Sequence, residues 1–160
     1  MAATAELHEA ALSRKFVPEG AGPDPKIYAA VMDWRVGNRQ LATMVSHEDG
    51  TTSIYLSSGA GVIGAGTIDD VQAIAAKFRN ACERLQDDFH PVDTWPPPPK
   101  RSCVFYLVKR DQTLVSKIFL TKDIAKPQHR FHEVHYIAHR LFTAIRTAKP
   151  QHDKNAASVG

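Results

Sequence analysis

Apolar and polar residues alternate along several short stretches of the chain, and this period of two is typical of β-strands. In residues 53–57, for example, Ile54 and Leu56 share one face of the predicted strand. Residues 103–109 are apolar on both faces, which predicts a strand in the middle of a sheet. Residues 27–36 fit either a strand or a short helix, and we favour the strand. Together the patterns predict five strands, at residues 28–35, 40–47, 52–58, 103–109 and 114–120.

Two longer stretches repeat their apolar residues every three or four positions, which predicts amphipathic helices. The first begins at about Ile68, and its apolar stripe comprises Val71, Ile74, Ala75, Phe78, Ala81, Cys82 and Leu85. The second runs from about His129 to Thr147, and its stripe comprises Phe131, Val134, Ala138, Leu141, Phe142 and Ile145. The order β-β-β-α-β-β-α predicts an α+β fold, with one antiparallel sheet of about five strands and both helices on one face.

Two short motifs predict where the chain turns or stays extended between these elements. Asp49-Gly50 predicts a tight turn between the second and third strands, because both residues tolerate positive φ. Four consecutive prolines at residues 96–99 predict a polyproline II segment. We interpret this segment as an internal strap that packs on the body of the protein together with Trp95; the alternative is a ligand for a proline-binding module.

The ends of the chain differ in composition from its middle. Prolines and glycines are concentrated before residue 26, so residues 1–25 are expected to form a flexible arm around, at most, a short helix. Residues 26–148 are expected to form a single α+β domain, a size that suits one hydrophobic core. Residues 149–160 are small and polar, and we expect a disordered tail there.

Composition narrows the cellular setting. The chain has no run of about 18 apolar residues, so no membrane span is expected. Its first residues include acidic side chains and lack the apolar core of a secretory signal. The two cysteines, Cys82 and Cys103, do not make a disulfide framework and are expected as buried thiols. We therefore expect a cytoplasmic protein.

Charge is spread unevenly along the chain. Residues 1–99 contain 8 Lys+Arg and 13 Asp+Glu, which gives a net charge of −5. Residues 100–149 contain 11 Lys+Arg and 3 Asp+Glu, which gives +8. A basic half of this kind allows nucleic-acid binding. The segment that marks RNA-recognition domains is absent, however. We favour a solvated basic face that meets the acidic part of a second copy.

A glycine-rich stretch separates the third predicted strand from the first predicted helix. Its spacing reads G-x-G-x-x-G, which in dinucleotide-binding proteins lets the backbone approach a phosphate. Asp69 and Asp70 already place negative charge at the helix N-terminus, and there they would oppose an incoming phosphate. The favoured interpretation is a bend that turns the chain. The candidate ligand-binding residues of the alternative are Gly59, Gly61, Gly64 and Gly66.

Histidines are concentrated on the last predicted helix. His132, His135 and His139 are three and four residues apart, so on a helix they point within about 60° of one another. Neutral imidazoles that converge from adjacent turns are typical metal ligands, and these three are the candidate ligands for a divalent cation. No other cofactor is expected. Two alternatives remain: a row of partly buried structural histidines, and an interface that responds to pH.

Catalytic motifs are missing from the sequence. It contains no G-x-S-x-G elbow and no pair of carboxylates placed for acid–base chemistry. Asp33 is the most unusual acid because it lies in an apolar stretch, and we expect it to accept a hydrogen bond from a turn amide. The aromatic residues that we expect at an interface are Trp34, Tyr55 and Trp95.

Several segments of the chain resemble a family of small bacterial proteins of uncharacterised function, over roughly residues 27–146. The shared pattern is MDW…DGTTSxYxSSGxGVIGxG, with a later Pro-rich segment, a strand like residues 104–107, and Phe131-His132…His135. Relatives carry glycine where this chain has Ala60 and Ala65. The resemblance implies a bacterial source and no particular activity. The order of elements is also loosely similar to roadblock-type dimerisation domains, which bind partner proteins and small GTPases.

The sequence therefore leaves two candidate functions open. The first is a non-catalytic protein-interaction module or adaptor subunit, which pairs with itself as a homodimer and binds an unknown protein partner. The second is a ligand-binding protein or enzyme that uses the glycine loop for a phosphate group or the helix histidines for a metal.

Overall fold

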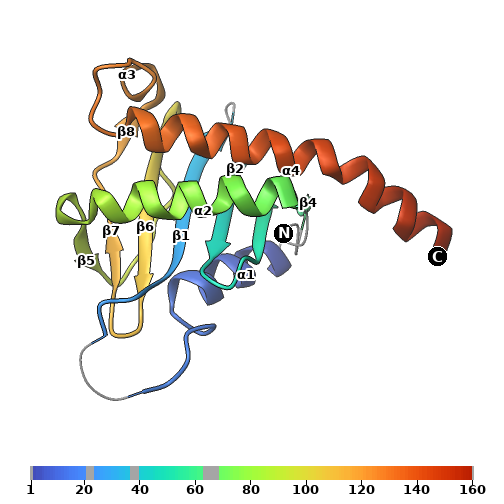
Figure 1. Cartoon of the computed structure of the whole chain (residues 1–160), viewed down its shortest axis with the longest axis horizontal. Coiled ribbons are helices and arrows are strands. Elements are labelled where there is room, and N and C mark those ends of the chain that lie inside the picture. Colours follow the sequence, from blue (N-terminus) through green and yellow to red (C-terminus); the bar gives the residue numbers. More distant parts are fainter. Residues whose placement is uncertain (1, 21–23, 37–39, 63–68, 160) are drawn as a thin grey trace.

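The computed structural model describes residues 2–20, 24–36, 40–62 and 69–159. These ranges form one antiparallel sheet with helices on both of its faces (Figure 1). The helices are α1 (Ala2–Leu12), α2 (Asp69–Arg84), the short α3 (Thr121–Ile124) and α4 (His132–Val159), with a 3-10 turn, η2, at Gln86–Asp88. The strands are β1 (Ile27–Val36), β2 (Gln40–His47), β3 (Thr52–Leu56), β4 (Gly61–Val62), β5 (His90–Val92), β6 (Ser102–Lys109), β7 (Thr113–Val115) and β8 (Phe119–Leu120).

The predicted fold class is confirmed, although the sheet has more strands than the five expected. Its order is β4-β3-β2-β1-β6-β7-β5, and β8 pairs with β6. The expected strand 114–120 is divided in two because Ser116 interrupts the ladder: its amide donates to the Phe105 carbonyl, and its hydroxyl accepts the Phe105 amide. Residues 27–36 are a strand, β1, which pairs with β2 on one side and with β6 on the other.

The larger of two hydrophobic cores lies between the sheet and the layer formed by α2 and α4. The predicted helical stripes supply it: Val71, Phe78 and Cys82 of α2 are at most 1% exposed, and Leu141 and Ile145 of α4 are fully buried. The two helices run side by side across the sheet (Figure 1). The prediction that two helices share one face is therefore confirmed for α2 and α4.

The opposite face of the sheet is covered by α1, which lies within the segment expected to be an arm. Leu12 of α1 is fully buried and packs in a second core with Val31, Val45 and Tyr106 of the sheet. The hydroxyl of Thr113 in β7 donates to the Leu12 carbonyl at 2.7 Å. The structured domain thus includes part of residues 1–25, because the apolar second face of β1, β2 and β6 has to be buried.

The proline-rich segment is packed on the body, as the strap interpretation expected. The Arg35 guanidinium donates to the Pro98 carbonyl at 3.1 Å, and the Trp95 indole N–H donates to Glu9 of α1 at 2.6 Å. The strap (residues 95–99) therefore joins the end of β1 to α1.

At the other end of the chain, α4 runs beyond the expected Thr147 terminus to Val159 and extends past the edge of the sheet (Figure 1). No helix among the described residues is long and apolar enough to cross a membrane.

Candidate functional site

Two of the three predicted interface residues come together in a groove beside α1. Tyr55, from β3, and Trp95, from the strap, line a groove of about 250 Å³ on the α1 side of the sheet. The other apolar lining residues are Ala5, Leu41, Leu56 and Pro97, and the polar ones are His8, Thr43 and Ser57. We call this set the aromatic groove. Trp34 does not belong to it, because its side chain projects from the opposite face of β1, where it contacts Phe142.

A buried carboxylate lies beneath the groove. Asp33 is fully buried in the middle of the sheet. One of its oxygens accepts a hydrogen bond from the Thr43 hydroxyl at 2.7 Å, and the other lies 2.7 Å from His8 Nε2. Asp33 was expected to bond to a turn amide, and that expectation is wrong: its side chain instead ties α1 to the sheet. The sequence held a usable signal, since a carboxylate inside an apolar strand needs polar partners on another element.

The pKa of His8 reflects two opposing influences. Burial lowers it, because a charged imidazole loses hydration. The hydrogen bond and the negative charge of Asp33 raise it by more, so that the pKa of His8 lies above its usual 6.5. The folded protein therefore holds a proton on His8 more tightly than an unperturbed imidazole would, because the buried carboxylate favours the charged form.

The polar groups of the aromatic groove are occupied by contacts within the protein. The Ser57 hydroxyl accepts the Leu41 amide at 2.9 Å, the Thr43 hydroxyl donates to Asp33, and His8 pairs with the same carboxylate. Each of these three side chains therefore already has a hydrogen-bond partner within the protein.

The glycine-rich stretch forms a hairpin turn as far as the structure describes it. Gly59 has a φ of +100°, and its amide donates to the Leu56 carbonyl at 2.9 Å. Gly61 lies opposite Tyr55 in the short β3–β4 ladder. A Cβ atom on Gly61 would lie 2.3 Å from the Ile54 carbonyl oxygen, so this position needs glycine for close strand packing. Gly64 and Gly66 lie outside the described residues.

The helix histidines divide into a pair and a single residue. His135 and His139 face each other across one turn of α4, with their Nε2 atoms 2.9 Å apart. His132 does not join them, because its Nδ1 atom is directed at the Ile124 carbonyl oxygen at 3.4 Å. Across the described residues, no three His, Cys, Asp or Glu side chains come together as a metal-binding group. Trp34 instead joins the histidine pair, with its ring centroid 4.5 Å from that of His139.

Burial governs the protonation of this pair. It lowers the pKa of His139, and burial together with the charges of His139, His132 and His129 lowers the pKa of His135 to about 4. His135 is only 8% exposed. At neutral pH both imidazoles are therefore uncharged, and one of them donates the Nε2 proton that the other accepts.

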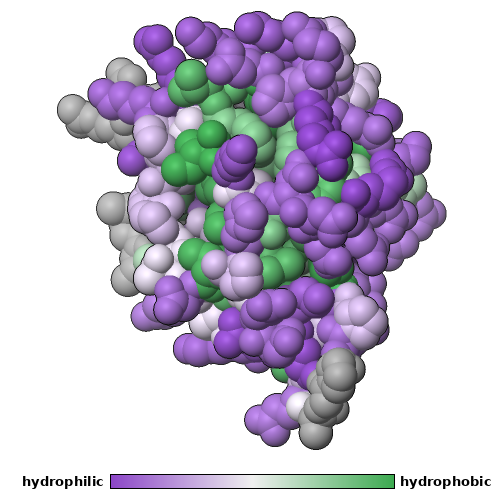
Figure 2. Space-filling model, turned by 90° about the vertical axis from the view of Figure 1, so that its left-hand side faces the viewer, coloured by the Kyte–Doolittle hydropathy of each residue, from purple (hydrophilic) through white to green (hydrophobic). Residues whose placement is uncertain are grey.

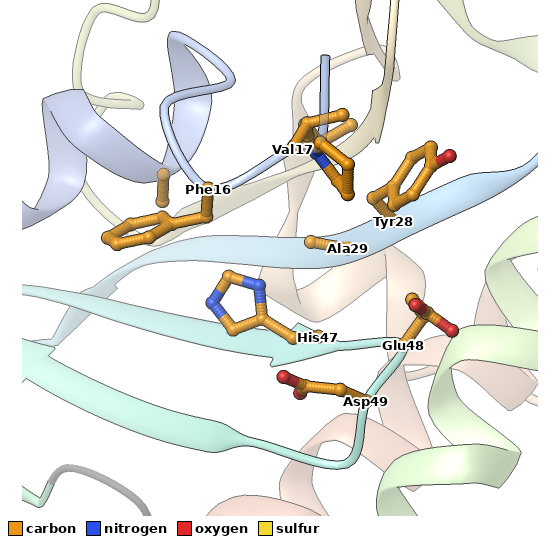
Figure 3. A pocket seen from close by; sticks show the side chains of 10 residues that line it. Phe16, Val17, Tyr28, Ala29, His47, Glu48 and Asp49 are labelled. Atoms are coloured by element: carbon orange, nitrogen blue, oxygen red, sulfur yellow. The ribbon is translucent and has the colours of Figure 1, made fainter. Parts of the chain in front are cut away.

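Two further hollows lie away from these residues. Figure 3 shows one of about 130 Å³, where Phe16 lies edge-on to the His47 ring and Tyr28, Glu48 and Asp49 complete the lining. Burial lowers the pKa of His47. The other, of about 430 Å³, lies beside η2 and β8 and is lined by Asp87, Asp88, His90, Lys117, Phe119, His129, Arg130 and Phe131. Figure 2 views the molecule from the side that carries β5 and β7 and shows apolar surface there between polar side chains.

Comparison of the chain with protein-family models, with curated proteins and with solved structures gave no match.

Proposed function

We propose that this protein is a non-catalytic protein-interaction module that binds a partner protein through the aromatic groove. The observation that carries the proposal is the meeting of Tyr55 and Trp95 in one hollow, although they come from β3 and from the strap. Aromatic residues that line a partly desolvated pocket are typical anchors of protein interfaces. The groove joins three separate segments of the chain, α1, the sheet and the strap.

The size and chemistry of the groove favour a side chain of a partner over a small molecule. Small-molecule sites usually enclose roughly 300–1,000 Å³, and the groove encloses about 250 Å³. Its walls are mostly apolar, and its polar groups are engaged within the protein. The matching occupant is one large apolar side chain on the surface of another protein.

The strap prepares the groove for binding. The hydrogen bond from Trp95 to Glu9 and the bond from Arg35 to the Pro98 carbonyl fix the strap at two points. Consecutive prolines leave this segment few conformations to lose. A partner therefore meets a wall that is already ordered, and this reduces the entropic cost of association.

Leu41→Arg provides the direct test, since Leu41 lines the groove but belongs to neither hydrophobic core. Ile118→Arg is the matched control, because Ile118 is 57% exposed and lies outside the groove. We expect the wild type and Ile118→Arg to retain the same proteins from a lysate of the source cells, as quantified by mass spectrometry, and Leu41→Arg to lose them. Equal capture by all three folded proteins would contradict the proposal.

We further propose that the module is a homodimer. Residues 1–99 carry −5 and residues 100–149 carry +8, so the acidic part of one copy can meet the basic part of the other. Native mass spectrometry should show a dimer for the wild type and for Leu41→Arg. A monomeric wild type would refute this part of the proposal alone.

A further inference from the structure

We infer that His135 and His139 form a two-nitrogen site for a divalent cation with tetragonal coordination, Cu²⁺ or Ni²⁺. Their Nε2 atoms lie 2.9 Å apart across one turn of α4. A cation between them would take the place of the proton that the two nitrogens otherwise share. This site lies on the opposite face of the sheet from the aromatic groove and does not depend on it.

The separation of the two nitrogens decides which cations fit. Metal–imidazole bonds are about 2.0–2.1 Å long. Two such bonds to nitrogens 2.9 Å apart enclose an angle of about 90° at the metal. This is the angle between neighbouring ligands in square-planar and octahedral complexes, whereas a tetrahedral cation such as Zn²⁺ prefers a wider angle. Divalent copper and nickel favour tetragonal nitrogen sites, and copper forms the strongest complexes of the series.

The protein around the pair holds it in place and leaves it reachable. The Trp34 ring lies edge-on to His139, and it also contacts Phe142 one turn further along α4. His135 is almost completely buried, so its ring has little freedom to turn away. His139 lines a depression of about 390 Å³ on the outer side of α2 and α4, which gives a cation a path from solvent and leaves room for water as the remaining ligands.

The charge around the site bears on its affinity. Arg140 lines the same depression, and its positive charge opposes a loosely held cation. Affinity must therefore come from direct bonds to the two nitrogens, and loss of either nitrogen should abolish it.

Trp34 offers a built-in reporter for the experiment. The chain contains two tryptophans, so Trp95→Phe leaves Trp34 as the only one. Bound Cu²⁺ quenches indole fluorescence at short range, and the Trp34 ring touches that of His139. Titration of untagged, metal-free Trp95→Phe protein with Cu²⁺ should therefore quench its fluorescence saturably, with one equivalent bound.

Two matched variants in the same background test the ligands. His139→Phe removes one nitrogen but keeps an aromatic ring against Trp34, and His132→Phe removes a histidine of the same helix that lies outside the pair. We expect His139→Phe to weaken binding by more than about tenfold, since even outer-shell changes at metal sites cost that much, and His132→Phe to bind as its parent does. Equal quenching in both variants, or no saturable quenching in the parent, would overturn the inference.

A second measurement needs no substitution at the site. The electron paramagnetic resonance spectrum of the wild-type Cu²⁺ complex should show tetragonal copper coupled to two imidazole nitrogens. Competition should rank Ni²⁺ above Zn²⁺. A copper spectrum without two nitrogens would overturn the site, and preferential binding of Zn²⁺ would overturn its tetragonal geometry. Neither result affects the proposed partner groove, which Leu41→Arg tests independently.

Discussion

Replacement of His8 by alanine tests the contact that joins α1 to the sheet. In the folded protein Asp33 is fully buried, and its two oxygens have one partner each, His8 and Thr43, both at 2.7 Å. His8→Ala leaves one oxygen of a buried carboxylate without a partner. Desolvation of a charged group is tolerated only while hydrogen bonds and an opposite charge offset it, so this substitution should destabilise the whole domain.

The magnitude follows from the burial of the two side chains. Removal of one partner from a fully buried ion pair costs about 3–5 kcal/mol. The His8 side chain is 16% exposed and Thr43 keeps its bond to Asp33, so water and one hydrogen bond relieve part of the loss. We expect a decrease of about 2–3 kcal/mol in the free energy of unfolding. Asp33→Asn should cost less, because a neutral amide needs no opposite charge and can still bond to both partners.

The effect should also depend on pH in a defined direction. The pKa of His8 is raised above its usual 6.5 in the folded state. A raised folded pKa means that the folded state binds the proton more tightly, so the stabilisation is fully present below the unfolded pKa and is lost as pH rises through the folded pKa. The difference in unfolding free energy between the wild type and His8→Ala should therefore be larger at about pH 6 than at about pH 9. Taking the difference cancels the contributions of the other histidines.

Urea denaturation followed by tryptophan fluorescence and circular dichroism gives these free energies. Glu6→Ala, on an exposed position of the same helix, controls for the substitution itself. A double-mutant cycle with Asp33→Asn should give a coupling of at least about 1 kcal/mol, because contacting residues in one network are not additive. A loss below about 0.5 kcal/mol, the usual range of surface substitutions, with no dependence on pH, would show that the buried pair does not hold α1 in place.

Other predictions concern the backbone and the thiols. Gly61→Ala should destabilise the protein by about 2 kcal/mol or more, because its Cβ would clash with the Ile54 carbonyl. Gly50→Ala should cost about 1 kcal/mol, because its Cβ would make only ordinary contact with the Gln72 side chain although φ is +98°; urea denaturation compares the two variants. Cys82 and Cys103 should not react with a thiol reagent in the native protein and should both react in denaturant, because burial raises the pKa of both thiols, that of Cys103 to about 12. Rapid labelling of either cysteine under native conditions would contradict their burial.

Local patterns predicted the elements of this fold well. The turn at Asp49-Gly50 forms as expected, with Gly50 at positive φ and the Thr51 amide bonded to the Asp49 carboxylate at 2.9 Å. The apolar stripe of the first predicted helix is the buried stripe of α2. These features depend on residues close in sequence, where periodicity and turn chemistry act directly.

The sequence did not predict that α1 covers the second face of the sheet, because the hydrophobic periodicity of this helix is weak. Its sequence is rich in alanine, and few large apolar residues mark its inner side. The indication lay elsewhere: residues 103–109 are apolar on both faces, so Tyr106 and its neighbours on that face had to be buried by something. The segment before β1 supplies most of that cover, and Trp95 of the strap packs against the same core.

The candidate sites show the same limit. The spacing predicted that His132, His135 and His139 lie on one side of the helix, because residues three and four apart are neighbours on its surface. It could not show that His132 turns toward Ile124, because that contact depends on where α3 packs. The pairing of His8 with Asp33 across 25 residues lies equally beyond any local pattern.

The central position of β6 has a consequence for how the chain folds as it is made. β1 ends at Val36, but one of its two neighbours, β6, begins only at Ser102. At roughly 5–20 residues per second, a ribosome adds the intervening segment in roughly 3–13 s. During that time the edge of β1 that later pairs with β6 has no partner strand. The Leu12 carbonyl of α1 also lacks the hydrogen bond that the Thr113 hydroxyl later donates. A newly made chain is thus most exposed to wrong strand pairing, and most in need of a chaperone, just before its second half emerges.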